Sequence, residues 1–124
     1  MGGYQNALNQ QTAASKVQTT PVTLVATQTL AVEAGMYLLA KTVAGVITIT
    51  LADPVSGADD GKEVIFVNNQ TQVNVLSGSF LSVGVAKTTA TFTAGLVGEF
   101  IRLKASAGKW LVLDIVTTGG ATMS

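Results

Sequence analysis

The sequence contains no cysteine and no histidine. Without cysteine, disulfides, zinc–thiolate sites and thiol nucleophiles are impossible. Without histidine, the Ser-His and Cys-His nucleophile arrangements are excluded as well. Charge is also scarce, because charged residues make up 11% of the 124 residues, against about 25% in ordinary soluble domains. The chain therefore lacks most of the side chains that perform catalysis, and its surface must be unusually neutral.

The few charges that are present cancel, with seven basic and seven acidic residues. Nucleic acids and anionic membranes are captured by clustered Lys and Arg, so we expect neither as a partner. No apolar run approaches the roughly 18 residues of a membrane-spanning helix. Only Asp114 among the acidic residues sits inside an apolar run, which leaves no obvious carboxylate pair for catalysis. We predict a protein that is not an enzyme and that uses no cofactor, metal or small-molecule substrate.

Two short motifs superficially suggest chemistry. "SAGK" (106–109) has the Ser-x-x-Lys spacing of a serine nucleophile, and "GADDGKE" (57–63) is spaced loosely like a phosphate-binding loop. The partner motifs of the first are missing, and a strand-forming run follows the second where a helix should begin. We interpret 106–109 as a hairpin turn, and Asp53, Asp59 and Asp60 as acceptors for backbone amides of their own loop. The alternative for the aspartates is a Ca²⁺ site, although the ligand spacing of a calcium-binding hand is absent.

Short strand-forming runs recur from Val22 onward, at 22–30, 36–41, 46–51, 63–67, 72–76, 80–86, 89–93, 99–105 and 110–116. Gly, Asn, Asp and Ser separate them, which is typical of antiparallel domains rather than of βαβ units. We predict an all-β domain at 21–117, an antiparallel β-sandwich or barrel-like domain of about eight to nine short strands. An extended N-terminal arm (1–20) precedes it, and a short flexible C-terminal tail (118–124) follows it.

The first 20 residues consist mainly of Gln, Asn, Thr, Ser and Ala. Such a polar tract cannot bury enough apolar surface to order itself. Its large apolar side chains include Tyr4, Leu8 and Val17, which we predict to anchor the arm on a partner protein. A disordered tail is the alternative interpretation.

Two of the strand-forming runs, "EVIFV" (63–67) and "WLVLDIV" (110–116), are apolar without alternation. A strand that is apolar on both faces must be covered on both, and in a domain this small the second cover is expected to be another subunit. We also expect Arg102 to pair with Glu99 or Asp114 across strands or subunits. The predicted subunit interface consists of Phe66, Phe100, Arg102, Trp110 and Asp114.

Three segments, "AGMYLLAKTVAGVITITLADP", "GKEVIFVNNQTQVNVLS" and "AGLVGEFIRLKASAGKWLVL", resemble small β-structured domains of bacteriophage virion proteins, found in fibres, spikes and capsid decoration proteins. The likeness is carried by residues 47–54, 61–69 and 108–113. One departure is the pair Ala52–Asp53, which stands where the pattern has Leu directly followed by Pro. The resemblance implies a homotrimer without enzymatic activity.

A chain with one domain and its own initiating Met suits a decoration (cement) protein that binds the outer capsid surface and stabilises it. We therefore expect a virion protein whose partners are its own copies and the major capsid protein. The alternative is a phage tail or head fibre or spike module with a receptor- or carbohydrate-binding role. In that case a sugar would stack on Trp110 or Tyr37 and would be hydrogen-bonded by Asn68, Asn69 and Gln70.

Overall fold

The computed structural model describes residues 20–40, 45–69, 73–92, 97–116 and 122–124. This part of the chain contains ten strands and no helix: β1 (Val22–Leu24), β2 (Gln28–Leu30), β3 (Gly35–Leu39), β4 (Ile47–Leu51), β5 (Glu63–Asn68), β6 (Asn74–Ser82), β7 (Val85–Phe92), β8 (Phe100–Ser106), β9 (Lys109–Val116) and β10 (Thr122–Met123). The predicted all-β fold is confirmed. Tyr4, Leu8 and Val17 of the predicted arm lie outside the described residues.

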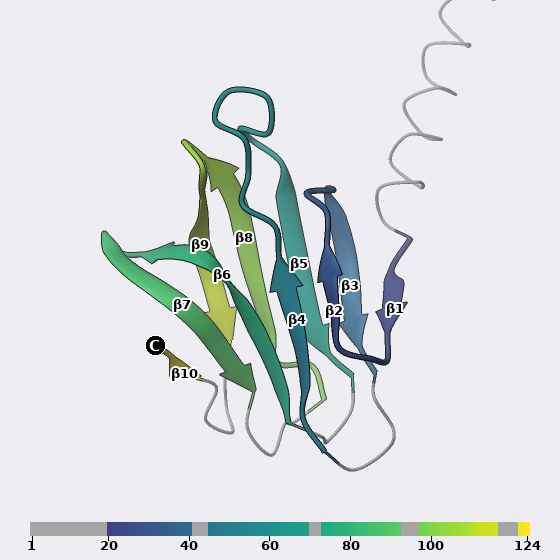
Figure 1. Ribbon diagram of the computed structural model, residues 1–124. Coiled ribbons are helices and arrows are strands. Elements are labelled where there is room, and N and C mark those ends of the chain that lie inside the picture. The colour runs from purple at the N-terminus through teal and green to yellow at the C-terminus, as the bar shows by residue number, and fades with distance from the viewer. Residues whose placement is uncertain (1–19, 41–44, 70–72, 93–96, 117–121) are drawn as a thin grey trace, which may run out of the picture.

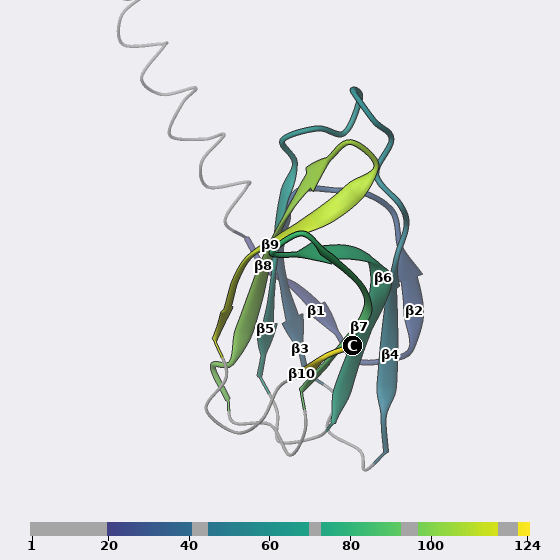
Figure 2. The ribbon, with the colours of Figure 1, turned by 90° about the vertical axis from the view of Figure 1, so that its left-hand side faces the viewer.

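The strands form one curled sheet that resembles half a barrel (Figure 1). Its order is β1-β3-β5-β8-β9-β6-β4-β2, with β7 paired to β6 and β10 paired to β7. The curl produces two walls that face each other (Figure 2). We call β1, β3, β5, β8 and β9 wall 1, and β2, β4, β6, β7 and β10 wall 2. The barrel-like form expected from the many short strands is therefore present.

The strand pairing is mixed, whereas the sequence was expected to give an antiparallel domain. From β1 to β6, successive strands alternate between the walls, so neighbours within a wall run in the same direction. The pairs β1–β3, β3–β5, β2–β4 and β4–β6 are accordingly parallel. Hairpins follow, and they make β6–β7 and β8–β9 antiparallel. Strand-forming runs and turn residues look alike in both arrangements, and they do not specify which wall the next strand joins.

Strand β6 connects the two walls. Its first half pairs with β4, and its second half pairs with β9, where Phe80 lies opposite Trp110. A β-bulge separates the halves between Ser77 and Phe80, and a bulge of this kind bends a strand. Gly78 lies at the bend, where a Cβ atom would come within 3.4 Å of the Leu51 Cβ and of the Phe80 ring. The missing side chain lets the core pack closely at this corner.

The hydrophobic core fills the space between the walls. In β4, the apolar residues Ile47, Ile49 and Leu51 point inward and alternate with Thr48 and Thr50, as the sequence period of two predicts. The largest fully buried side chains are Trp110, Phe66, Phe80 and Phe92. Within the described ranges, no helix is long and apolar enough to cross a membrane.

The C-terminal residues add a strand to wall 2. Thr122 and Met123 lie opposite Thr91 and Ala90 of β7. Ser124 and Thr89 exchange two backbone hydrogen bonds, each with a nitrogen–oxygen distance of 3.0 Å. The prediction of a flexible tail is therefore wrong for 122–124, because the edge of β7 supplies backbone partners. Residues 118–121 of that predicted tail lie outside the described residues.

Candidate functional site

The aspartates of the loop between β4 and β5 hold the loop together. Asp59 Oδ2 accepts a hydrogen bond from the Val55 amide at 2.7 Å, and Asp59 Oδ1 lies 2.9 Å from Lys62 Nζ. The hydrogen bond from Val55, with help from Lys62, lowers the pKa of the Asp59 carboxyl. Asp60 Oδ1 accepts a hydrogen bond from the Ala107 amide at 2.9 Å in the β8–β9 turn. The predicted acceptor role is confirmed for Asp59, whereas Asp60 accepts from an amide of a different loop and not of its own.

The segment 106–109 is a hairpin turn, as predicted. Ser106 lies opposite Lys109 in the β8–β9 ladder. Ala107 and Gly108 have φ angles of 50° and 79°, and a type I′ turn requires positive φ at both central residues. The hydrogen bond from the Ala107 amide to Asp60 holds this turn against the long loop between β4 and β5. Strand β5 begins at Glu63, directly after "GADDGK", so no helix N-terminus is present to hold a phosphate. The described residues contain no group of three or more acidic side chains that could hold a metal.

Most of the aromatic side chains predicted to face a partner or a sugar are buried in the core. Phe66 is 0% exposed and Trp110 is 1% exposed. Trp110 Nε1 donates to the Ala52 carbonyl at 3.1 Å, while the Tyr37 ring stacks on Phe66 with centroids 5.0 Å apart. The prediction of Phe66 and Trp110 as interface residues is therefore wrong, and so is that of Trp110 or Tyr37 as a sugar platform. A large aromatic in an apolar strand run has the same sequence signature whether it points inward or outward.

A buried polar cluster joins the walls at one end of the core. Asn74 Nδ2 of β6 donates to Asn68 Oδ1 of β5 at 2.9 Å, and both side chains are fully buried. The backbone amide of Asn68 donates to the backbone carbonyl of Glu99 at 2.7 Å, and Glu99 is only 3% exposed. Asn68 is thus a structural residue rather than a sugar ligand. Of the other predicted sugar ligands, Asn69 is exposed and Gln70 lies outside the described residues.

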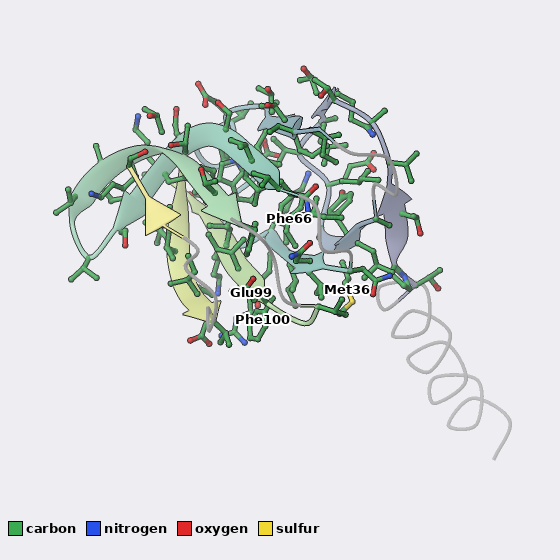
Figure 3. The ribbon with its side chains drawn as sticks, turned by 90° about the horizontal axis from the view of Figure 1, so that it is seen from below. Met36, Phe66, Glu99 and Phe100 are labelled. Atoms are coloured by element: carbon green, nitrogen blue, oxygen red, sulfur yellow. The ribbon has the colours of Figure 1, made fainter. Side chains whose placement is uncertain are left out.

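The outer face of wall 1 carries apolar side chains from four adjacent strands. One row across the sheet contains Leu38, Val67, Phe100 and Val116, which are paired in register through β3, β5, β8 and β9. Figure 3 shows Phe100 and Met36 on the outer side of this wall, with Phe66 between the walls. We call this surface the apolar face, and it consists of Met36, Leu38, Ile65, Val67, Phe100 and Val116. All six are partly or largely exposed.

Charged residues accompany the apolar face in a balanced set of two acids and two bases. Arg102 Nε lies 3.1 Å from Glu63 Oε1, at an angle that makes the contact an ion pair rather than an aligned hydrogen bond. Arg102 is also opposite Asp114 in the β8–β9 register, but its close partner is Glu63 on the other neighbouring strand. The predicted pairing of Arg102 with Glu99 or Asp114 within the chain is therefore corrected to Glu63. The fourth charge of the set belongs to Lys104, which is exposed.

The exposure of Leu113 and Asp114 arises from a β-bulge. The β8–β9 register shifts between Arg102 and Leu103, which leaves Leu113 as the extra residue of β9. Both Leu113 and Asp114 are consequently exposed. In "WLVLDIV", the lack of alternation between apolar and polar residues therefore comes in part from this bulge, and not from a strand whose two faces are both covered. The outward apolar residues of β5, Ile65 and Val67, still match the interpretation made from the sequence.

The outer face of wall 2 has a different composition. Before the bulge in β6, its outward positions are Thr29, Thr48, Thr50, Ser77, Thr89 and Thr91, with Val75 as the one aliphatic residue between them. Beyond the bulge, Leu81, Val85 and Ala86 are partly or largely exposed. Hydroxyl side chains remain hydrated in solution, whereas aliphatic and aromatic ones gain free energy when they are removed from water. The continuous row of apolar side chains across four strands therefore belongs to wall 1.

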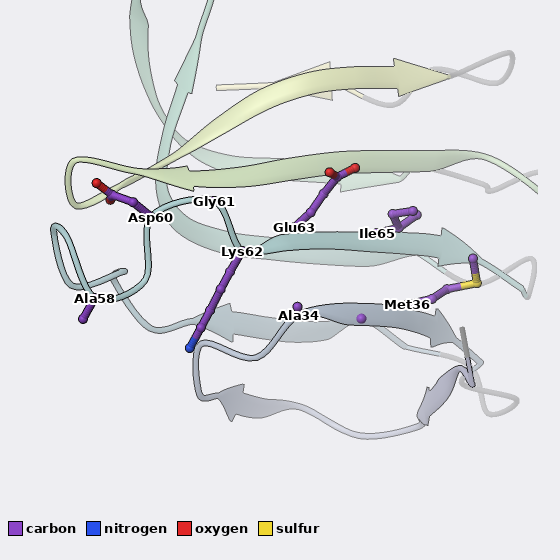
Figure 4. Close-up of a pocket in the computed structure, with 9 residues that line it drawn as sticks. Ala34, Met36, Ala58, Asp60, Gly61, Lys62, Glu63 and Ile65 are labelled. Atoms are coloured by element: carbon purple, nitrogen blue, oxygen red, sulfur yellow. The ribbon is translucent and has the colours of Figure 1, made fainter. Parts of the chain in front are cut away.

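A shallow hollow of about 720 Å³ adjoins the apolar face at the ends of β3 and β5. Figure 4 shows that Glu63 and Ile65 stand on one side of β5 and that Lys62 points to the other side. Lys62 Nζ already contacts Asp59 Oδ1 and the Val32 carbonyl, the latter at 3.3 Å. Because Met36 and Ile65 belong both to the hollow and to the apolar face, we treat the two as one continuous surface.

Comparisons with known proteins add no functional assignment. Neither a protein-family model nor a curated protein matches this chain.

Proposed function

We propose that this chain is a structural protein of a bacteriophage virion, and that it decorates and stabilises the outer surface of the capsid as a homotrimer. The observation that carries the proposal is the contrast between the two walls. One outer face is apolar across four strands, and the other consists mainly of Thr and Ser. A protein with this contrast is suited to assembly through one face while the other remains in water.

The chemistry of the chain supports a role without catalysis. It has neither His nor Cys, and Asp59 and Asp60 of the loop between β4 and β5 are engaged with backbone amides and Lys62. The segments that resemble virion proteins correspond to the region of β4, to β5 and to the start of β9. The role of the arm at 1–20, which we predict to lie over neighbouring capsid subunits, stays a prediction.

Repeated attachment to a shell would stabilise that shell by mass action. A ligand that binds the assembled capsid but not its dissociated subunits lowers the free energy of the assembled state. A trimer can bind through three equivalent contacts at once, so modest contacts give tight attachment. The partner expected from this proposal is the major capsid protein.

The decisive experiment is to measure the copy number of the protein in purified virions by quantitative mass spectrometry against the major capsid protein. We expect a simple ratio, near one copy or one third of a copy per capsid subunit. A few copies per particle would instead indicate the alternative proposal, a tail or head fibre or spike module. Absence from particles would refute both virion roles.

A further inference from the structure

We infer that the apolar face is covered by a second copy of this chain. The inference deepens the proposed homotrimer, because it assigns the contact between subunits to the outer face of wall 1. It rests on the size of the face, on its charge balance and on the shortness of the sheet edges.

The apolar face and the charged residues beside it form a broad surface. They span four strands, β3, β5, β8 and β9, which at a spacing of about 4.8 Å makes the surface roughly 19 Å wide. Three successive outward residues of β5, such as Glu63, Ile65 and Val67, extend the face by about 14 Å or more. The resulting footprint is roughly 270 Å² before side-chain relief is included, about a third of the ~800 Å² of accessible surface that each partner contributes to a standard interface, so this surface forms the central part of such a contact.

The charges of this face suit contact between copies of the same chain around a three-fold axis. Glu63 and Arg102 neutralise each other within one chain, so two copies can approach at this point without repulsion between like charges. Within the described ranges, neither Lys104 nor Asp114 forms an ion pair, and they have opposite signs. Each copy therefore offers one acid and one base to the next copy. A strongly acidic or basic partner would find no net opposite charge on this surface.

The edges of the sheet offer less to a second copy than the face does. Strands β1 and β2, which end the curled sheet, have three residues each, and β10 has two. Short edge strands leave few backbone groups for pairing with another chain. Assembly through these three strands alone would thus form few hydrogen bonds, whereas assembly through the apolar face removes Leu38, Val67 and Phe100 from water.

The test compares the mass of the full chain with that of matched variants by sedimentation velocity and light scattering. We expect a wild-type mass near three times 12.7 kDa, as the proposed homotrimer requires. Val116→Lys and Val67→Glu place a charge within the proposed contact, and we expect each to shift the protein to monomer or to weaken association at least roughly tenfold. Thr50→Glu places the same charge as Val67→Glu on the outer face of wall 2 and should leave the mass unchanged.

Folding of each variant is checked through the fluorescence of Trp110, the single tryptophan, which is buried in the core. A wild-type protein that is monomeric at about 100 μM would overturn the inference, since useful self-association should be visible there. The inference also fails if both face variants fold and keep the wild-type mass. A monomer that is abundant in virions would refute this inference and the homotrimer but leave the decoration role standing, whereas an oligomer that is absent from virions would refute the proposed function alone.

Discussion

The turn between β6 and β7 holds an aliphatic residue in an unfavourable backbone conformation. Val83 and Gly84 have φ angles of 48° and 77°, which places both in the left-handed region. The left-handed conformation costs an L-residue about 1–2 kcal/mol, and it is especially unusual for β-branched side chains. Val83 is 98% exposed, so its side chain gains almost nothing from packing to offset that cost.

Replacing Val83 with Asn should therefore stabilise the protein. Asn tolerates the left-handed region, and Asn-Gly is the pair that two-residue turns of this kind favour most. We expect the free energy of unfolding to rise by about 1 kcal/mol, because little packing is lost at a side chain that is almost fully in solvent. For a chain of this length, that gain corresponds to an increase in Tm of about 4 °C. Differential scanning calorimetry measures both quantities.

The control is Val97→Asn. Val97 is 62% exposed but is not among the residues of the described chain that have positive φ. This control should change the free energy of unfolding by no more than about 0.5 kcal/mol, as most surface substitutions do. If Val83→Asn leaves Tm unchanged or lowers it, the turn is not strained and the reasoning from its dihedral angles is wrong.

Two further predictions concern the core and the long loop. Trp110→Ala should reduce the free energy of unfolding by about 3–5 kcal/mol, and Trp110→Phe should reduce it by less. Urea unfolding followed by circular dichroism measures both changes. An unchanged stability in Trp110→Ala would contradict the buried position of this residue. Because the pKa of Asp59 is lowered in the folded state, its contribution to stability is present above the ordinary carboxyl pKa and is lost as pH falls through the lowered value. Stability should therefore decline less steeply with acid in Asp59→Asn than in wild type, and equal slopes in urea unfolding across pH 2–6 would refute that role.

The sequence predicts the strands of this protein far better than their pairing. The alternation of Ile and Thr in β4 specifies its buried face, and Gly108 marks the β8–β9 turn. By contrast, the bulge that exposes Leu113 depends on the partner strand, and no periodicity within β9 reveals it. The burial of Trp110 depends likewise on the long loop, whose Ala52 carbonyl accepts its indole hydrogen. Both features are tertiary contacts between segments far apart in the chain.

The candidate site shows the same dependence at a larger scale. Two of the first six strands, β3 and β5, are apolar on both sides. They are the third and fifth strands along the chain, and both belong to wall 1. The even strand β4, which alternates Ile with Thr, joins wall 2. Because successive strands alternate between walls, residues such as Leu38 and Val67 become neighbours although a wall 2 strand separates them in the sequence. Hairpin β8–β9 then extends this surface through Phe100 and Val116. A chain whose consecutive strands paired with one another would mix apolar and hydroxyl side chains on both walls, so the alternating path is what gathers the apolar side chains of β3 and β5 on one face.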